Sequence, residues 1–181
     1  GFAGYLSWYI NRQPTGTDKM REIYSAIRDG SKAYLKRQYK TISIIAVILA
    51  VIFYFAFDFK KLPYTAAAFL LGAICSLVAG YLSMEVATRA NVRTSAAAEK
   101  GVAQALKISF YGGLVMGLAN VALSLIGVTT LYWLYGNPKM IIGFGFGASL
   151  SALFAQLGGG IFTKAADVGA DLVAVSYTHL T

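Results

Sequence analysis

"ISIIAVILAVIFYFAF", residues 42–57, contains no charged side chain and decides the fold class of this chain. The hydrocarbon core of a bilayer requires about 20 apolar residues in a helix, so flanking residues must complete a membrane span here. The whole chain agrees with this run, because 57% of its 181 residues are hydrophobic and only 13% are charged. Its mean hydropathy is +0.59. This composition exceeds what a soluble domain of the same length needs for its core, and it predicts an integral membrane protein.

Three more apolar runs follow residues 42–57 and are long enough to cross a bilayer: Tyr64–Met84, Ile108–Tyr135 and Met140–Phe162. The opening "GFAGYLSWYI", residues 1–10, is too short to span and lacks the basic start of a signal peptide, so we expect the tail of a truncated helix. The predicted fold is all-α, a polytopic transmembrane helix bundle with about four full spanning helices and a truncated first helix.

Basic residues give the bundle an orientation. The chain has 16 lysines and arginines against 8 acidic residues. Thirteen of these lysines and arginines lie in Arg12–Lys40, in Arg89–Lys107 and at Lys164. The connections at the opposite end contain the other three, Lys60, Lys61 and Lys139. The positive-inside rule places the thirteen on the cytoplasmic side, and because they flank membrane spans, nucleic acid is not an expected partner. One cysteine, Cys75, excludes a disulfide framework within the chain.

Between the first short run and residue 42, the stretch "TGTDKMREIYSAIRDGSKAYLKRQYKTI", residues 15–42, has helical apolar spacing with charges between. Thr17 is placed to cap a helix, and Asp18 favours its positive end. We expect an amphipathic helix that lies along the cytoplasmic interface and contacts anionic lipid headgroups.

Small residues recur at helix-packing distance within the apolar runs. Lipid supplies no hydrophobic drive between helices, so such rows indicate close approach of one helix to another. The rows are Gly72, Ser76 and Gly80; Gly113 and Gly117; and Gly143 and Gly147.

The stretch "GGGIFTKAADVGADLV", residues 158–173, places charges directly after an apolar run. Asp167 and Asp171 are spaced i, i+4 and share a helix face, with Lys164 one turn before them. Magnesium suits this pattern, because proteins usually hold it through one or two carboxylates together with phosphate oxygens and water, and a lysine supplies charge for the phosphate. A solvated helix end would show the same spacing, so both interpretations stay open. The three glycines indicate a kink or a packing site, since no Walker-type Gly-Lys-Ser/Thr follows.

This stretch resembles the pyrophosphate-binding segment of the membrane-bound, ion-translocating pyrophosphatases. Two others agree with it in family order: "MREIYSAIRDGSKAYLKRQYKTI", residues 20–42, resembles the amino-terminal amphipathic segment, and "ATRANVRTSAAAEKGVAQALKISFYGGLVMG", residues 87–117, resembles the second cytoplasmic loop and the following helix. The resemblance covers about residues 15–173.

The resemblance implies an enzyme that hydrolyses inorganic pyrophosphate at the cytoplasmic face and moves protons or sodium ions across the membrane. It implies that Lys164 contacts pyrophosphate and that Asp167 and Asp171 bind Mg2+, which bridges to the substrate. It further implies the remainder of the same polypeptide and a homodimer as partners, and a cell or inner membrane if the source is prokaryotic. The attacking-water residues lie in later helices of the family, so this chain alone is expected to be inactive.

The chain departs from the family pattern in two places. Gln156 stands where many members have an arginine of the ion-coupling path, and an amide lacks that charge. After residue 173 the chain reads "AVSYTHLT", residues 174–181, where the family continues with Gly-Lys. We expect residues 1–173 to be the amino-terminal part of the bundle and 174–181 a non-native tail, and we assign His179 no role. A non-enzymatic transporter or scaffold with a solvated aspartate pair is the alternative.

Overall fold

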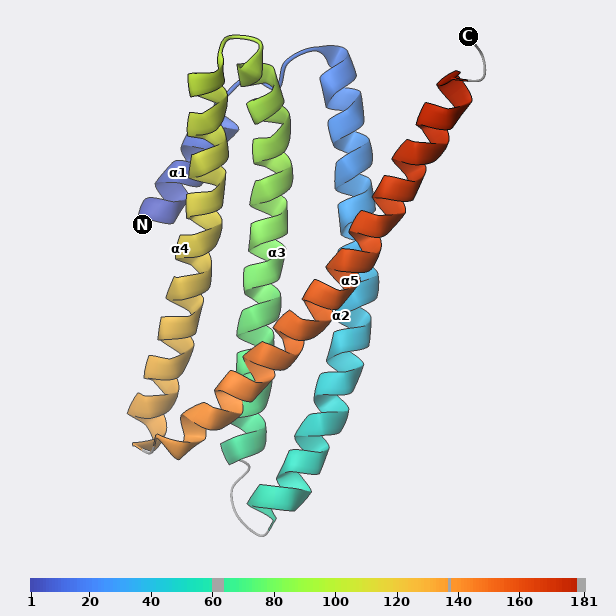
Figure 1. The fold of residues 1–181 in the computed structure, drawn as a ribbon. Helices are drawn as coiled ribbons and strands as arrows, with labels where there is room; N and C mark the ends of the chain where they lie inside the picture. The colour runs from blue at the N-terminus through green and yellow to red at the C-terminus, as the bar shows by residue number, and fades with distance from the viewer. Residues whose placement is uncertain (60–63, 137, 179–181) are drawn as a thin grey trace.

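The computed structural model describes residues 1–59, 64–136 and 138–178, and that part of the chain is helical with no strand (Figure 1). A short helix, α1, is followed by four long helices, and the first of these, α2, continues into a π-helical turn, η1. The elements are α1 (Phe2–Asn11), α2 (Asp18–Phe53), η1 (Tyr54–Asp58), α3 (Tyr64–Ala98), α4 (Val102–Tyr135) and α5 (Lys139–Thr178).

Four helices are long and apolar enough to cross a membrane, as predicted. They cover Asp18–Asp58, Tyr64–Ala98, Val102–Tyr135 and Ile141–Val175. Many large apolar side chains point outward from them, and Trp133 is 82% exposed. Outward apolar side chains are costly in water and normal against lipid, so the surface supports the all-α membrane bundle.

The amphipathic segment is the first half of α2 and continues without interruption into the first span. The prediction of a separate helix along the interface is therefore wrong. Thr17 does cap this helix, since its Oγ1 accepts a hydrogen bond from the Met20 amide at 3.3 Å. Residues 18–53 contain no proline and only one glycine, Gly30, so nothing in the sequence breaks the helix between the amphipathic segment and the span.

The helix α3 likewise extends beyond its predicted end at Met84, reaching Ala98. A tight turn at Glu99–Gly101 then leads into α4. Gly101 has a φ of 141°, which favours glycine at this turn. Most of the predicted loop Arg89–Lys107 is thus a helical hairpin, because alanine-rich sequence on both sides of the turn favours helix.

The α2–α3 corner is fixed by a buried carboxylate. Asp58 is 5% exposed, and its Oδ2 accepts hydrogen bonds from the amides of Thr65 at 2.9 Å and Ala66 at 3.0 Å. These amides belong to the first turn of α3 and have no partner within the helix. The carboxylate therefore caps α3 from the end of η1.

Helix α3 contacts every other helix and is the centre of the bundle (Figure 1). On one side α1 packs against α3 and α4, with Leu6 and Ile10 buried beside Ala90 and Val115. On the other side Phe69 and Ala73 of α3 pack against Ala46 and Ala50 of α2. Helix α3 therefore lies between α1 and α4 on one side and α2 on the other, and α5 crosses α3 and α2 (Figure 1).

The closest helix contact joins α3 and α5, where glycines allow backbone to touch backbone. A Cβ added to Gly72 would lie 2.0 Å from the Phe144 carbonyl oxygen, and one added to Gly147 would lie 1.8 Å from the Phe69 carbonyl oxygen. At Gly143 the added atom would lie 2.8 Å from the Thr65 oxygen. These three glycines confirm the prediction of close packing.

The glycine row of α4 behaves differently. A Cβ on Gly113 or Gly117 would meet no atom within 4 Å, so these residues approach no other helix in the described part of the chain. The close approach to α3 uses Gly112 instead, where an added Cβ would lie 2.9 Å from the Ala90 Cβ. No helix described here packs on Gly113 and Gly117, so close approach at this face stays a prediction, and the contact of α4 with α3 lies one residue earlier.

The connections alternate between the two ends of the bundle. The turns after α1 and after α3 lie at one end together with the end of α5, and the α4–α5 connection lies at the other end with η1 (Figure 1). The two predicted basic segments therefore share one end, as the positive-inside rule requires of them.

Substituting Gly147→Ala tests the helix contact directly. The added methyl group collides with the Phe69 backbone, so we expect the free energy of unfolding to fall by about 1–3 kcal/mol. Gly145→Ala is the matched control, because a Cβ there meets nothing within 4 Å and alanine favours helix by up to about 1 kcal/mol. Unfolding by SDS in mixed micelles, followed by circular dichroism, measures both; equal stability of the two variants would contradict the contact.

Candidate functional site

The predicted charge triplet lies on the second half of α5, which runs as one helix through residue 178. Lys164 and Asp167 form an ion pair, with 3.8 Å between Nζ and Oδ2. Asp171 follows Asp167 at i+4, and the helix places it on the same face. The structure thus brings the three side chains to one side of one helix.

The triplet is exposed in this chain. The side chains of Lys164 and Asp167 are 80% and 58% accessible, and Asp171 is exposed as well. Carboxylates one turn apart repel by a few tenths of a kcal/mol, and a divalent cation between them would remove that cost. Two accessible carboxylates beside an ammonium group match the ligand chemistry of Mg2+ with a phosphate.

Within the part of the chain that the structure describes, no third acidic or metal-binding side chain completes this pair. Among the described residues, no group of three or more His, Cys, Asp and Glu side chains lies close enough to hold a metal ion. A cation at Asp167 and Asp171 would take its remaining ligands from water, phosphate oxygens or other protein segments.

Helix α2 fixes α5 just before the triplet. The Tyr34 hydroxyl donates to the Ala155 carbonyl oxygen at 2.9 Å, and the Gln38 side-chain amide donates to the Phe154 carbonyl oxygen. The ring of Tyr34 also packs on Phe162 at 5.3 Å between centroids. Sequence analysis did not identify Tyr34 or Gln38; their i, i+4 spacing on the amphipathic segment is the signal that could have identified them.

The three glycines before the triplet do not break the helix. A Cβ on Gly158 would lie 2.5 Å from the Gln38 side-chain oxygen, whereas one on Gly160 would meet nothing within 4 Å. Of the two structural interpretations, close packing describes Gly158. Gln156, two residues earlier, is exposed on the same helix.

A second charged cluster joins α2 to α3 near the same end of the bundle. Glu85 Oε1 accepts from Arg28 Nη2 at 2.9 Å and from Arg89 Nε at 2.9 Å, and Arg89 Nη2 also contacts it. The Glu85 side chain is 19% accessible. The buried Nε of Arg28 has no hydrogen-bond partner in the described residues. Glu85 therefore lies within the helical bundle, and the cluster connects two helices.

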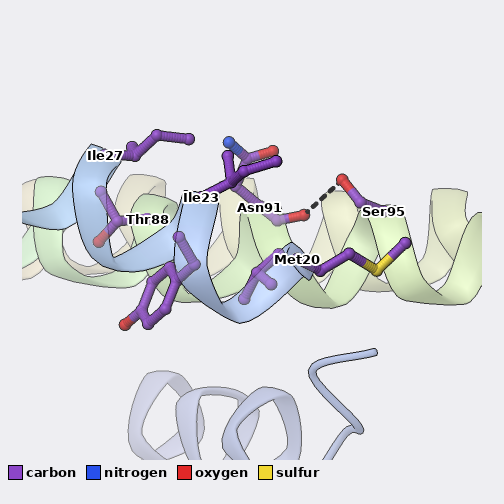
Figure 2. A pocket seen from close by; sticks show the side chains of 8 residues that line it. Met20, Ile23, Ile27, Thr88, Asn91 and Ser95 are labelled. Carbon is purple, nitrogen blue, oxygen red and sulfur yellow. Dashed lines mark hydrogen bonds between the residues drawn. The ribbon is translucent and has the colours of Figure 1, made fainter. Parts of the chain in front are cut away.

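A groove between α2 and α3 has a volume of about 200 Å³ (Figure 2). Met20, Ile23 and Ile27 line it from α2, and Thr88, Asn91 and Ser95 line it from α3. The Ser95 hydroxyl donates to the Asn91 backbone oxygen at 3.2 Å. Its polar lining groups are the Tyr24 phenol, the hydroxyls of Thr88 and Ser95 and the Asn91 amide, with no carboxylate for a metal and no cation for a phosphate, so the α5 triplet is the candidate site.

The end of the chain leaves part of the prediction open. Helix α5 includes residues 174–178, so the sequence that departs from the family pattern is helical as far as it is described. His179 lies outside the described residues. The non-native origin of residues 174–181 stays a prediction.

Comparison with known proteins identifies relatives over nearly the whole chain. A family model described as "Inorganic H+ pyrophosphatase" matches residues 1–178. The chain is 53% identical over 172 residues to a K(+)-insensitive pyrophosphate-energized proton pump of Methanosarcina mazei, a match covering 95% of this chain and 25% of the pump.

Two other relatives give similar coverage. The chain is 47% identical over 187 residues to a K(+)-insensitive pyrophosphate-energized proton pump of Caldanaerobacter subterraneus, covering 91% of this chain and 26% of that protein. It is 49% identical over 173 residues to a putative K(+)-stimulated pyrophosphate-energized sodium pump of Clostridium tetani, covering 95% of this chain and 25% of that protein. The chain spans about a quarter of the length of these relatives.

Membrane-type helices and membrane-pump relatives agree with each other, so the chain is an integral membrane protein. The family match extends over far more than half of its residues, including the α5 triplet. The chain belongs to the inorganic H+ pyrophosphatase family.

Proposed function

We propose that this chain is part of a membrane enzyme that hydrolyses inorganic pyrophosphate at the cytoplasmic face and couples the reaction to ion translocation. The observation that carries the proposal is the single face of α5 with Lys164, Asp167 and Asp171 in a member of this family. The relatives are named as proton pumps and as a sodium pump, so the transported ion is a proton or a sodium ion.

The three side chains have separate roles in this proposal. The Lys164 ammonium group binds a phosphate oxygen of pyrophosphate as a compact positive charge. Asp167 and Asp171 hold Mg2+, whose chemistry when bound is to neutralise substrate charge and stabilise the leaving phosphate. Their placement beyond the apolar part of α5 keeps both carboxylates at the aqueous end of the helix, where a soluble substrate reaches them.

This chain supplies only part of such a site. Pyrophosphate carries up to about four negative charges, and its reaction requires several cations and opposing ligands in fixed positions. One lysine and two carboxylates from one helix supply the ligands on only one side of the substrate. The chain covers a quarter of its relatives' length, so the remainder of such a polypeptide, and a second copy in a homodimer, are proposed partners.

Gln156 is the proposed point of difference in ion coupling. Its neutral amide lies eight residues before Lys164 on α5, where the family resemblance leads us to expect an arginine. A glutamine donates hydrogen bonds without a fixed positive charge, so coupling in this member depends on another cation or on polar contacts alone.

The proposed orientation follows from the basic residues. The turns after α1 and α3 and the α5 triplet face the cytoplasm, and the chain crosses a prokaryotic cell membrane, if that is its source, several times.

Substituting Asp171→Asn in a protein of full family length that contains these 181 residues tests the site. Loss of a carboxylate that holds Mg2+ is expected to lower pyrophosphate hydrolysis by at least about 100-fold. Asp29→Asn is the control, because Asp29 is an exposed aspartate of α2 that is not part of the triplet. Phosphate release in membranes at millimolar Mg2+ is the measurement, with the 181 residues alone expected at background. Full activity of Asp171→Asn would refute the proposed role.

Cysteine labelling tests the orientation. In a Cys75→Ser background, a cysteine replacing Lys19 is expected to react with a membrane-impermeant maleimide only from the cytoplasmic side, and one replacing Gly136 only from the opposite side. Inside-out and right-side-out vesicles provide the two sides. Reversed labelling at both positions would overturn the orientation and the cytoplasmic placement of the triplet.

A further inference from the structure

A basic pocket lies where the ends of α1 and α3 meet the start of α4. Its volume is about 290 Å³. The polar side chains in its lining are Tyr9 and Gln13 from α1 and the turn after it, Arg93 and Lys100 from α3 and the turn after it, and Gln104 and Lys107 from α4. None of its lining residues comes from α5, so the pocket is separate from the Lys164–Asp171 triplet.

The pocket has three positive charges in its lining and no carboxylate. Among the described residues, no carboxylate forms an ion pair with Arg93, Lys100 or Lys107. Glu99 is next to Lys100 in the chain but does not line the pocket. Uncompensated positive charge inside a concave surface attracts an anion.

The arginine of the pocket is held in place by neutral backbone groups. Arg93 Nε donates to the Gln13 carbonyl oxygen at 3.2 Å, Nη2 donates to that of Asn11 at 3.3 Å, and Nη1 donates to that of Arg89 at 2.7 Å. These oxygens orient the guanidinium without cancelling its charge. The charge is therefore fixed before a ligand arrives, which lowers the entropy cost of binding.

Aromatic rings hold the lysine on the opposite wall. Lys107 Nζ lies 5.5 Å from the ring centroid of Tyr9 and 5.7 Å from that of Tyr111. The two rings pack edge to face at 5.5 Å between centroids. Cation–π contacts keep an ammonium group near the rings and leave its N–H donors for a ligand.

The pocket lies at the boundary between the polar end and the apolar part of the bundle. Lys107 directly precedes the apolar run that begins at Ile108. Tyr9, which lines the pocket, and Trp8 next to it on α1 are aromatic residues of the kind found at membrane interfaces. Tyr5 lies one turn before the lining residue Tyr9 on the same face of α1, is 58% exposed and stacks on Trp8 at 5.9 Å between ring centroids, a surface suited to acyl chains.

We propose that this pocket binds the phosphate group of an anionic phospholipid, with Arg93, Lys100 and Lys107 as its charged contacts. Basic pockets between membrane helices on the cytoplasmic side suit such headgroups. Free phosphate shares this chemistry, but the exposed aromatic side chains of α1 next to the pocket favour a ligand that also carries acyl chains. The site would hold α1 against α3 and α4 through one lipid.

The test is native mass spectrometry of the purified protein titrated with phosphatidylglycerol, with phosphatidylcholine as the zwitterionic probe. Each basic residue near an anionic headgroup contributes about fivefold in affinity, so Lys100→Gln/Lys107→Gln should bind one phosphatidylglycerol roughly 30-fold more weakly. Lys32→Gln/Lys36→Gln is the matched control, because it removes two exposed lysines of α2 outside the pocket and should retain wild-type affinity.

Three results would overturn the proposal. Equal affinity of the pocket variant and the control for phosphatidylglycerol would show that the two lysines are not contacts. Equal affinity of the unsubstituted protein for phosphatidylcholine and phosphatidylglycerol would show that headgroup charge has no role. Displacement of the lipid by millimolar inorganic phosphate or pyrophosphate would assign the pocket to a soluble anion. None of these outcomes bears on hydrolysis, which depends on α5.

Discussion

The contact of backbone with backbone between α3 and α5 is the constraint on which the arrangement depends. Gly72, Gly143 and Gly147 leave no room for a single Cβ at the crossing, so the two helices touch at a defined point. From this point α5 leads away from α4 and crosses α2 on its way to the polar end (Figure 1). A helix held at one close contact needs a second one to fix its direction, and Tyr34 and Gln38 of α2 supply it.

Polar groups within the bundle support the same arrangement, because membrane helices gain little from apolar contact alone. Asp58 caps α3 from the end of η1, and the hydroxyl of the buried Ser151 in α5 donates to the Ala73 oxygen of α3 at 3.4 Å. At the polar end Glu85 connects Arg28 to Arg89. The Asp58, Ser151 and Arg28–Glu85 bonds each join two different helical elements, so removing one partner would leave the other polar group without its bond.

Much of the fold is predictable from the sequence, because charge-free runs of apolar residues have few structural solutions in a bilayer. The spans, the Thr17 cap and the α3–α5 glycines follow from such patterns. The continuity of α2 does not, since an amphipathic stretch and an apolar span share the same helical period and only tertiary contacts decide whether they stay in line. The offset from Gly113 to Gly112 is a matter of helix rotation, which spacing alone leaves undetermined.

The candidate site was predictable in part as well. The i, i+4 spacing gives the common face of Asp167 and Asp171, while their assignment to Mg2+ and pyrophosphate comes from the family. The i, i+4 spacing of Tyr34 and Gln38 places both on one face of α2, but their acceptors are backbone oxygens, so the sequence does not show which helix this face contacts. Position in the sequence therefore identified the charged side chains but not what holds their helix.

The most direct measurement is calorimetric titration of imidodiphosphate, a pyrophosphate analogue that resists hydrolysis, into a protein of full family length that contains these 181 residues. Binding is expected only with Mg2+ present, and Asp167→Asn is expected to weaken it by about 10- to 100-fold, as loss of a charged contact does. Asp29→Asn should bind like the unsubstituted protein. Unchanged affinity and unchanged Mg2+ dependence in Asp167→Asn would contradict the assignment of this α5 face to the metal and its substrate.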